Sequence, residues 1–128
     1  MRYLLDTHAL VWWLMDVNEL GRRAHTTIAE RSNEIFVSAV SAFEIARKNR
    51  LGKWPEVDQL VEHFDDLLAA ERFTPLPVTM HHAIRAGQFR MTHRDPFDRI
   101  LAAQAHAEDL TLITIDPAFA EFPIEILW

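Results

Sequence analysis

Short strand-like runs alternate with helical segments along the chain, and this alternation constrains the fold more than any other feature. Runs of aliphatic and aromatic residues predict five strands, at 2–6, 34–39, 73–78, 111–116 and 124–128. The segments between them predict helices at 8–16, 19–32, 41–52, 56–72, 79–89 and 96–109. Because such alternation is typical of a mainly parallel sheet, we expect an α/β fold with a sheet of about five strands.

The length and composition are those of one globular domain spanning residues 1–128. The absence of cysteine excludes disulfides and cysteine-based zinc sites and favours a cytoplasmic location. The apolar start is interrupted by Asp6 and His8 and lacks a small-residue cleavage site, so we expect no signal peptide. No stretch approaches the roughly 18 uninterrupted apolar residues of a membrane span. The net charge of −6 disfavours broad electrostatic binding of nucleic acid but permits a local basic patch, or cations on clustered acids.

Four acidic residues stand where predicted strands end or helices begin. Asp6 ends the first strand, and Asp116 ends the fourth. Glu44 is expected in the first turn of the helix after the second strand, and Asp98 in the first turn of the helix before the fourth. In a parallel sheet with right-handed crossovers, Asp6, Glu44 and Asp116 reach the same sheet edge, and the loop before Asp98 can return there.

Each of these acids also has a structural interpretation. Ser41 and Glu44 have the spacing of a capping box. Asp95 precedes a proline, as capping residues at helix starts often do. The other acids can cap the turns that follow them. Capping alone, however, does not explain why four acids fall on what should be one face of the protein.

Converging carboxylates need a counter-charge. Two carboxylates about 4 Å apart repel each other by about 4 kcal/mol at an effective dielectric constant near 20. Protons or cations must therefore neutralise a cluster of three or four acids. Carboxylate oxygens prefer Mg²⁺ or Mn²⁺, and a cluster without histidine ligands indicates metal-assisted phosphoryl chemistry.

Four stretches carry a family resemblance: LLDTHALVW, SAVSAFEIARK, HRDPFDRILAAQA and TLITIDPAF. In this order and spacing, the chain resembles PIN-domain ribonucleases, and more narrowly the VapC-type toxins of type II toxin–antitoxin pairs. The resemblance implies a PIN-like three-layer α/β/α sandwich with the acids at the carboxyl edge of the sheet. It also implies endonucleolytic cleavage of RNA with one or two Mg²⁺ or Mn²⁺ ions, leaving a 5′-phosphate and a 3′-hydroxyl. The implied partners are RNA and a cognate VapB-like antitoxin, in a homodimer or a hetero-oligomer with the antitoxin and without a membrane.

The acidic site of the family maps onto four residues of this chain, Asp6, Glu44, Asp98 and Asp116. The resemblance assigns the main metal ion to the first three, whereas Asp116 would bind a second ion or orient the attacking water. Asp95 ranks lower as a ligand because capping explains it better. Thr7 and Thr114 stand where the family often has small hydroxyl residues that support the acids.

Basic residues near the acids are candidate RNA contacts. Arg47 and Lys48 follow Glu44 on its helix, and His93 and Arg94 precede Asp98. These side chains can reach RNA phosphates, or they can simply form solvated surface.

Three tryptophans are candidate contacts for an antitoxin or a second toxin subunit. Trp12 and Trp13 lie about 100° apart on a helix, so they cannot both point the same way into the core. Trp54 falls in a predicted exposed connection. Core packing is an equal alternative for Trp12 and Trp13.

Two other functions stay open. A phosphatase that forms an aspartyl phosphate on Asp6 is weaker, because the stretch DTHA lacks a second aspartate two residues on. A non-catalytic PIN-like module that only binds a partner is also possible. The intact acids disfavour this module, since a purely structural surface should not collect charges that repel one another.

Overall fold

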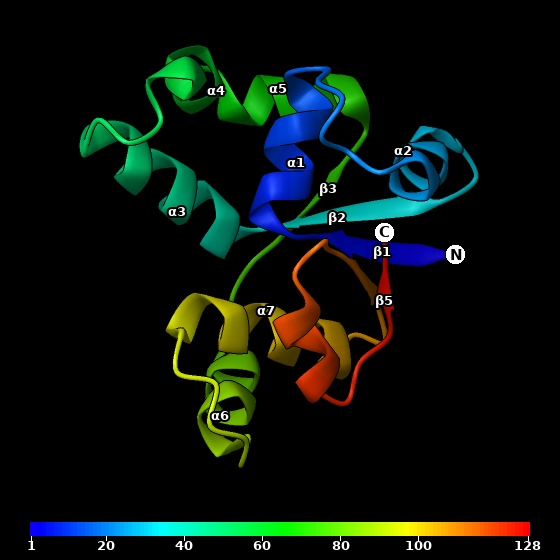
Figure 1. Cartoon of the computed structure of the whole chain (residues 1–128), viewed down its shortest axis with the longest axis vertical. Helices are drawn as coiled ribbons and strands as arrows, with labels where there is room; N and C mark the ends of the chain where they lie inside the picture. The colour runs from blue at the N-terminus through cyan, green and yellow to red at the C-terminus, as the bar shows by residue number, and fades with distance from the viewer.

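A single five-stranded parallel sheet organises the computed structural model, which describes residues 1–128 (Figure 1). The strands are β1 Arg2–Leu5, β2 Glu34–Ser38, β3 Thr74–Leu76, β4 Thr111–Ile113 and β5 Ile126–Leu127. Their order across the sheet is β3-β2-β1-β4-β5, and every neighbouring pair is parallel. The predicted number and direction of the strands are therefore confirmed.

Helices cover both faces of the sheet, which makes the structure a three-layer α/β/α sandwich (Figure 1). The upper layer in the figure holds α1 Thr7–Leu14, α2 Arg22–Ala29, α3 Ala39–Arg50, α4 Asp58–Glu62 and α5 Phe64–Glu71. The lower layer holds α6 Met80–Gln88, α7 Pro96–Ala107 and the 3₁₀ helix Pro117–Glu121. The longest helices, α3 and α7, have 12 residues each, and no helix is both long and apolar enough to span a membrane.

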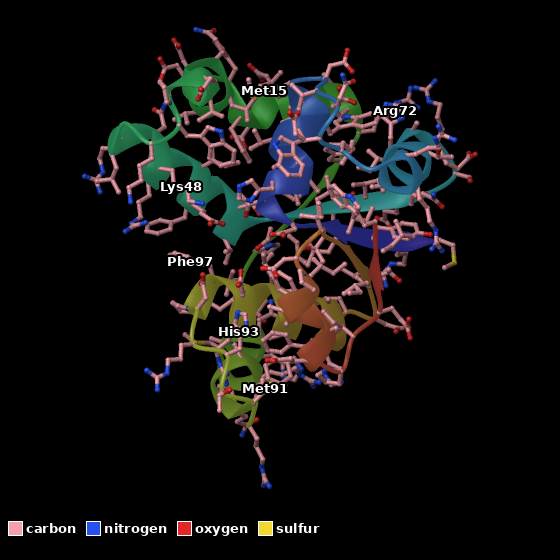
Figure 2. The ribbon with its side chains drawn as sticks, viewed as in Figure 1. Met15, Lys48, Arg72, Met91, His93 and Phe97 are labelled. Atoms are coloured by element: carbon pink, nitrogen blue, oxygen red, sulfur yellow. The ribbon has the colours of Figure 1, made fainter.

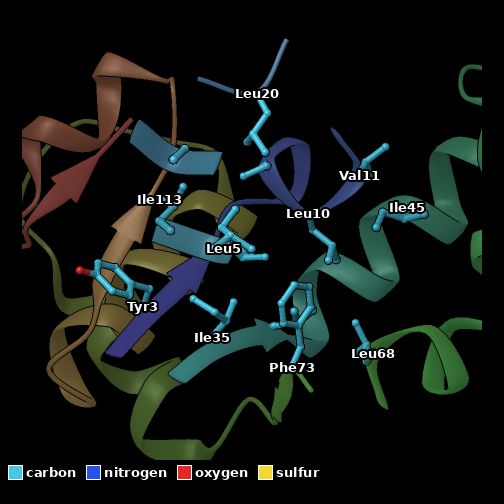
Figure 3. Close-up of a cluster of buried hydrophobic side chains, with 14 of the residues drawn as sticks. Tyr3, Leu5, Leu10, Val11, Leu20, Ile35, Ile45, Leu68, Phe73 and Ile113 are labelled. Atoms are coloured by element: carbon cyan, nitrogen blue, oxygen red, sulfur yellow. The ribbon is translucent and has the colours of Figure 1, made fainter. Parts of the chain in front are cut away.

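Alternating side chains along the strands divide the core into two clusters, because successive residues of a strand point to opposite faces of the sheet. In β1, Tyr3 and Leu5 pack beneath the upper helices, whereas Leu4 packs against α7. Figure 3 shows the upper cluster, in which Leu5 lies near Leu10 of α1. The central strand is thus buried on both sides, and its carboxyl end is held rigidly.

Two predicted helices differ from the observed ones. The predicted helix 56–72 is divided into a 3₁₀ turn at Pro55–Val57 and the helices α4 and α5, which are separated at His63. Leu60 of α4 and Leu68 of α5 are both buried in the upper core, whereas Val61 is exposed. The helix predicted to start at Ser41 instead begins at Ala39.

Candidate active site

The register of the sheet gathers three strand ends at one edge. Leu5 of β1 pairs with Val37 of β2 and with Ile113 of β4. The residues that follow these strand positions, including Asp6 and Thr114, therefore lie side by side. The backbone N–H of Asp6 extends the ladder by donating to the Ile113 carbonyl at 3.0 Å.

Asp6 is the most deeply buried of the acids, with 9% of its surface exposed. Its Oδ1 accepts the backbone N–H of Thr7 at 2.8 Å, which caps α1, and its Oδ2 accepts the hydroxyl of Thr114 at 2.7 Å. Burial raises the pKa of Asp6; the two hydrogen bonds and the nearby His8 oppose this rise, and the charge of Glu44 adds to it. The capping interpretation is therefore confirmed for Asp6, and its role as a site residue stays a prediction.

Thr7 connects α1 to α3. Its hydroxyl donates to Oε1 of Glu44 at 2.7 Å and lies 2.9 Å from the hydroxyl of Ser41, which is fully buried. Ser41 is thus not a helix cap, because Ser38 caps α3 by accepting the N–H of Val40. The proposed capping box of Ser41 and Glu44 is wrong.

Glu44 lies in the second turn of α3 rather than the first, on the side that faces α1. Its Oε2 forms an ion pair with Lys48 Nζ at 3.1 Å, one helical turn further along. This i,i+4 pair partly neutralises the acid. Glu44 therefore contacts two side chains of the protein, a hydroxyl and an ammonium group.

Asp98 enters the site from the lower layer. Asp95 is exposed and caps α7, accepting the N–H groups of Phe97 at 2.9 Å and Asp98 at 3.4 Å. Oδ2 of Asp98 lies 2.9 Å from Nε2 of His93. Burial raises the pKa of Asp98 to about 6; the charges of Asp95 and Asp6 contribute to the rise, and His93 opposes it.

Asp116 is joined to Asp6 through Thr114. Its backbone N–H donates to Thr114 Oγ1 at 3.0 Å, and the same hydroxyl donates to Asp6 Oδ2. The Oδ1 of Asp116 caps the 3₁₀ helix Pro117–Glu121 through the N–H of Ala118 at 2.9 Å. Thr114 thus supports both acids, as the family resemblance implies for a small hydroxyl residue at this position.

The donor chemistry of this edge fits a hard divalent cation, since the acids offer carboxylate oxygens and no thiol or imidazole is needed. In the present side-chain arrangement, however, no three acidic or histidine side chains lie close enough together to hold a metal ion. Two of the acids instead contact basic side chains of the protein: Glu44 forms an ion pair with Lys48, and Asp98 lies within hydrogen-bond distance of the His93 ring. Binding a metal ion here therefore requires these side chains to turn away.

The site is an open edge rather than a deep hollow. The five main surface pockets contain none of the four acids. An open edge suits a chain-like substrate, whereas small-molecule sites usually enclose most of the ligand.

A family model described as PIN domain matches residues 3–125 of the chain. The chain belongs to the PIN domain family.

Several solved structures share its fold at low identity. One is the crystal structure of VapBC2 from Rickettsia felis bound to a promoter DNA fragment. The match covers 99% of this chain and 98% of that one, with 20% identity and a TM-score of 0.74. A toxin–antitoxin complex from Klebsiella pneumoniae matches with 19% identity and a TM-score of 0.69, over 98% of this chain and 96% of that one. DNA-bound VapBC from Salmonella typhimurium matches with 19% identity and a TM-score of 0.66, over 99% and 97%. No curated protein sequence matches the chain.

The basic side chains of this PIN domain divide into paired and unpaired groups. Arg47 and Arg94 are exposed and make no ion pair, so they are available to a ligand. Lys48 and His93 already contact acids of the site. Figure 2 shows Lys48 on α3 in the upper layer and His93 beside α7 in the lower layer.

Arg99 is a residue whose role the sequence did not reveal. Its guanidinium donates to four backbone carbonyls of the segment before α7, at distances from 2.5 to 3.2 Å: those of Ala86, Phe89, Met91 and His93. The segment from Phe89 to Arg94 has no regular structure, so its carbonyls need donors from elsewhere. Arg99 therefore holds the loop that presents His93 to Asp98.

The three tryptophans of the sequence prediction lie in two places. Trp13 packs against Phe73 and His25, and its Nε1–H donates to Glu71 at 3.1 Å, so it closes the edge of the upper core. Trp12 and Trp54 instead lie on either side of His8, near the acids. Contact with an antitoxin or a second subunit stays a prediction for all three.

Proposed function

We propose that this PIN domain is a Mg²⁺- or Mn²⁺-dependent endoribonuclease and the toxin of a VapBC-type toxin–antitoxin pair. The single observation that carries the proposal is the buried carboxylate of Asp6 at the carboxyl edge of the sheet, with Glu44 and Asp98 near enough to act on it electrostatically and Asp116 joined to it through Thr114. Burying a charge is costly unless a cation compensates it. The raised pKa values of Asp6 and Asp98 are the sign of that uncompensated cost.

In the proposed site, Asp6, Glu44 and Asp98 hold the main divalent ion, and Asp116 holds a second ion or orients water. When bound, the ion supplies a nucleophilic water at neutral pH and stabilises charge on the phosphate. Thr7 and Thr114 fix the orientation of the acids through their hydroxyl groups, as outer-shell partners do in metal sites. Asp95 acts as a helix cap in this proposal. Cleavage leaves a 5′-phosphate and a 3′-hydroxyl.

An antitoxin is the proposed protein partner, because the structures that share the fold include toxin–antitoxin complexes. We further propose that the toxin acts in the cytoplasm, as a homodimer or in a hetero-oligomer with the antitoxin. Copurification with the product of a neighbouring gene and the mass of the resulting complex test this part of the proposal.

The test of the activity compares Asp6→Asn with Asp109→Asn. Asp109 is exposed and precedes β4 at the opposite edge of the sheet, and its φ of 56° suits asparagine. The parent protein and Asp109→Asn should cut an end-labelled RNA in Mg²⁺ or Mn²⁺, stop with chelator and arrest growth when expressed. Asp6→Asn should keep its circular dichroism spectrum and lose both effects. Full nuclease activity in Asp6→Asn would contradict the site assignment.

A non-catalytic module that only binds a partner is the second candidate. The observation that favours it is that Glu44 forms an ion pair with Lys48 and Asp98 contacts the His93 ring, so both acids have partners within the protein. Calorimetric binding of Mn²⁺ without RNA cleavage would support this candidate. The aspartyl-phosphate alternative gains no support, because both oxygens of Asp6 already accept hydrogen bonds. Acid-stable phosphate on Asp6 would revive it.

A further inference from the structure

We propose that a groove beside the acids binds single-stranded RNA by stacking its bases on tryptophan. This inference rests on the proposed nuclease function and names the form of its substrate. The groove has a volume of about 460 Å³ and is lined by five residues, His8, Trp12, Lys48, Lys53 and Trp54. Its residues come from α1, α3 and the connection that follows α3.

Aromatic rings form the walls of the groove. The ring of His8 lies 5.3 Å from that of Trp12 and 5.2 Å from that of Trp54, measured between ring centres. His8 is exposed, and both tryptophans are partly exposed. Trp128 supports Trp12 from behind, with 5.8 Å between ring centres. The groove therefore offers flat apolar surface to solvent, and an unpaired base can cover it.

The wall that carries Trp54 is fixed in place. Asn49 donates to the Trp54 carbonyl at 3.0 Å and to Oδ1 of Asp58 at 2.6 Å. The turn that brings the chain back has Gly52 at a φ of +74°, a conformation that side chains rarely adopt. The N–H of Lys53 then donates to the Lys48 carbonyl at 3.0 Å. A ligand therefore meets a preformed surface and loses little free energy in ordering it.

Positive charge gathers at this groove although the whole chain carries a net charge of −6. The only two lysines of the sequence both line it. Lys48 Nζ lies 5.5 Å from the centre of the Trp54 ring and forms the ion pair with Glu44. Lys53 is exposed and makes no ion pair, so its charge is free for a phosphate. Aromatic rings interleaved with cations are what proteins use to bind single strands without base pairing.

The groove leads directly to the acids. Lys48 lines it and contacts Glu44, and His8 follows Asp6 by two residues at the start of α1. A strand lying across Trp12 and Trp54 therefore continues to the edge where cleavage is proposed. Stacking requires unpaired bases, so this site selects loops and single strands over duplex RNA.

The first test measures binding apart from cleavage. Asp6→Asn protein in chelator is titrated into a fluorescein-labelled unstructured RNA oligonucleotide, and anisotropy is recorded. Adding Trp54→Leu should weaken binding by about 5- to 100-fold, the range expected for the loss of one stacked base. Trp13→Leu is the matched control, because Trp13 packs at the far edge of the upper core; it should leave binding unchanged. Trp54→Phe should restore most of the affinity.

A second variant guards against misfolding at Trp54. Lys53→Glu changes an exposed residue without side-chain partners, and it should weaken binding and reduce the dependence of log Kd on log salt by about one phosphate contact. Arg31→Glu, on the loop after α2, is the charge-matched control and should have little effect. Equal binding by Trp54→Leu and Trp13→Leu, with no effect of Lys53→Glu, would overturn the inference. If the parent protein still cuts RNA in that case, the proposed nuclease function holds without the groove. If the parent protein cuts no RNA but binding depends on Trp54, the nuclease proposal fails and the groove inference holds. Loss of antitoxin binding alone in Trp54→Leu would also overturn the inference and assign the groove to the protein partner.

Discussion

Both edges of the sheet carry acidic residues, but the pKa values of these residues shift in opposite directions at the two edges. At the carboxyl edge, burial raises the pKa of Asp98 to about 6 and raises that of Asp6. At the amino edge, Glu30 is fully exposed, and hydrogen bonds from the backbone and hydroxyl of Ser32, both at 3.1 Å, lower its pKa. The number of acidic residues is therefore a poor indicator of a functional site, and the desolvation of their carboxylates is a better indicator.

Pocket volume alone would favour the amino edge instead of the edge where the site is proposed. The amino edge has a hollow of about 500 Å³, lined in part by Glu30, Arg31, Glu71 and Arg72. Charges of both signs alternate there in contact with water, which screens them. At the carboxyl edge, by contrast, desolvation is the largest influence on the pKa values of Asp6 and Asp98.

The largest expected effect comes from Asp98→Asn, compared with Glu30→Gln at the amino edge. Removing a proposed metal ligand should lower RNA cleavage by at least about 100-fold, beyond the range seen for outer-shell partners. Glu30→Gln should leave cleavage unchanged, because Glu30 only accepts bonds from its own turn. Initial rates on labelled RNA measure both. Equal losses in the two variants would remove the distinction between the edges.

Thr7→Val tests the support of the acids. The variant leaves Ser41 and Glu44 without their shared hydroxyl partner, so cleavage should fall by about 10- to 100-fold. The free energy of unfolding should fall by about 1–3 kcal/mol, because a buried polar group loses its hydrogen bond. Urea unfolding and cleavage rates measure the two effects. Thr26→Val, whose hydroxyl bonds the exposed carbonyl of Arg22, is the control and should change both only slightly.

The smallest expected effect is a dependence of stability on pH in metal-free protein. Because the pKa of Asp98 is raised in the folded state, the folded state binds more protons than the unfolded state between about pH 4 and pH 6. The free energy of unfolding should therefore fall as pH rises through this window, by about 1–2 kcal/mol once partial exposure is allowed for. Urea unfolding of the parent and Asp98→Asn at several pH values isolates this contribution.

Glu30 should change the free energy of unfolding with pH in the opposite direction. Its lowered pKa means that its stabilising hydrogen bonds are present above its usual pKa and are lost as pH falls. The difference in stability between the parent and Glu30→Gln should therefore shrink toward acid pH. A pH profile of the same sign for Asp98→Asn and Glu30→Gln would contradict the contrast between the edges.

The sequence predicted the strands and the edge at which the acids meet, because both depend on local patterns and on the general geometry of parallel sheets. It misplaced the start of α3, since the spacing of Ser41 and Glu44 imitates a capping box while Ser38 performs the capping. A contact between α1 and α3 decided the role of Ser41, and no local pattern encodes such a contact. The pairing of Glu44 with Lys48 was within reach, because their i,i+4 spacing favours it.

Other parts of the site depend on distant segments. The bonds from Arg99 to the carbonyls of Phe89 and Met91 join a helix to a loop that has no regular pattern. The break at His63 interrupts a stretch in which the apolar spacing of Leu60 and Leu68 suits one continuous helix, so the local pattern does not reveal it. Whether the acids of this chain hold a metal ion stays a prediction, because it depends on side-chain rotations around Glu44 and Asp98.

The hydrogen bonds from Arg99 to the loop before α7 determine how the carboxyl edge of the sheet can open. Since the same helix carries both Arg99 and Asp98, the loop and its imidazole travel with the carboxylate as one piece. His93 can then leave Asp98 by rotation of its ring, which packs against Phe119 and Phe122, without displacement of the loop. In the proposed nuclease, a metal ion would therefore reach Asp98 after the rotation of one side chain, with the backbone of the loop in place.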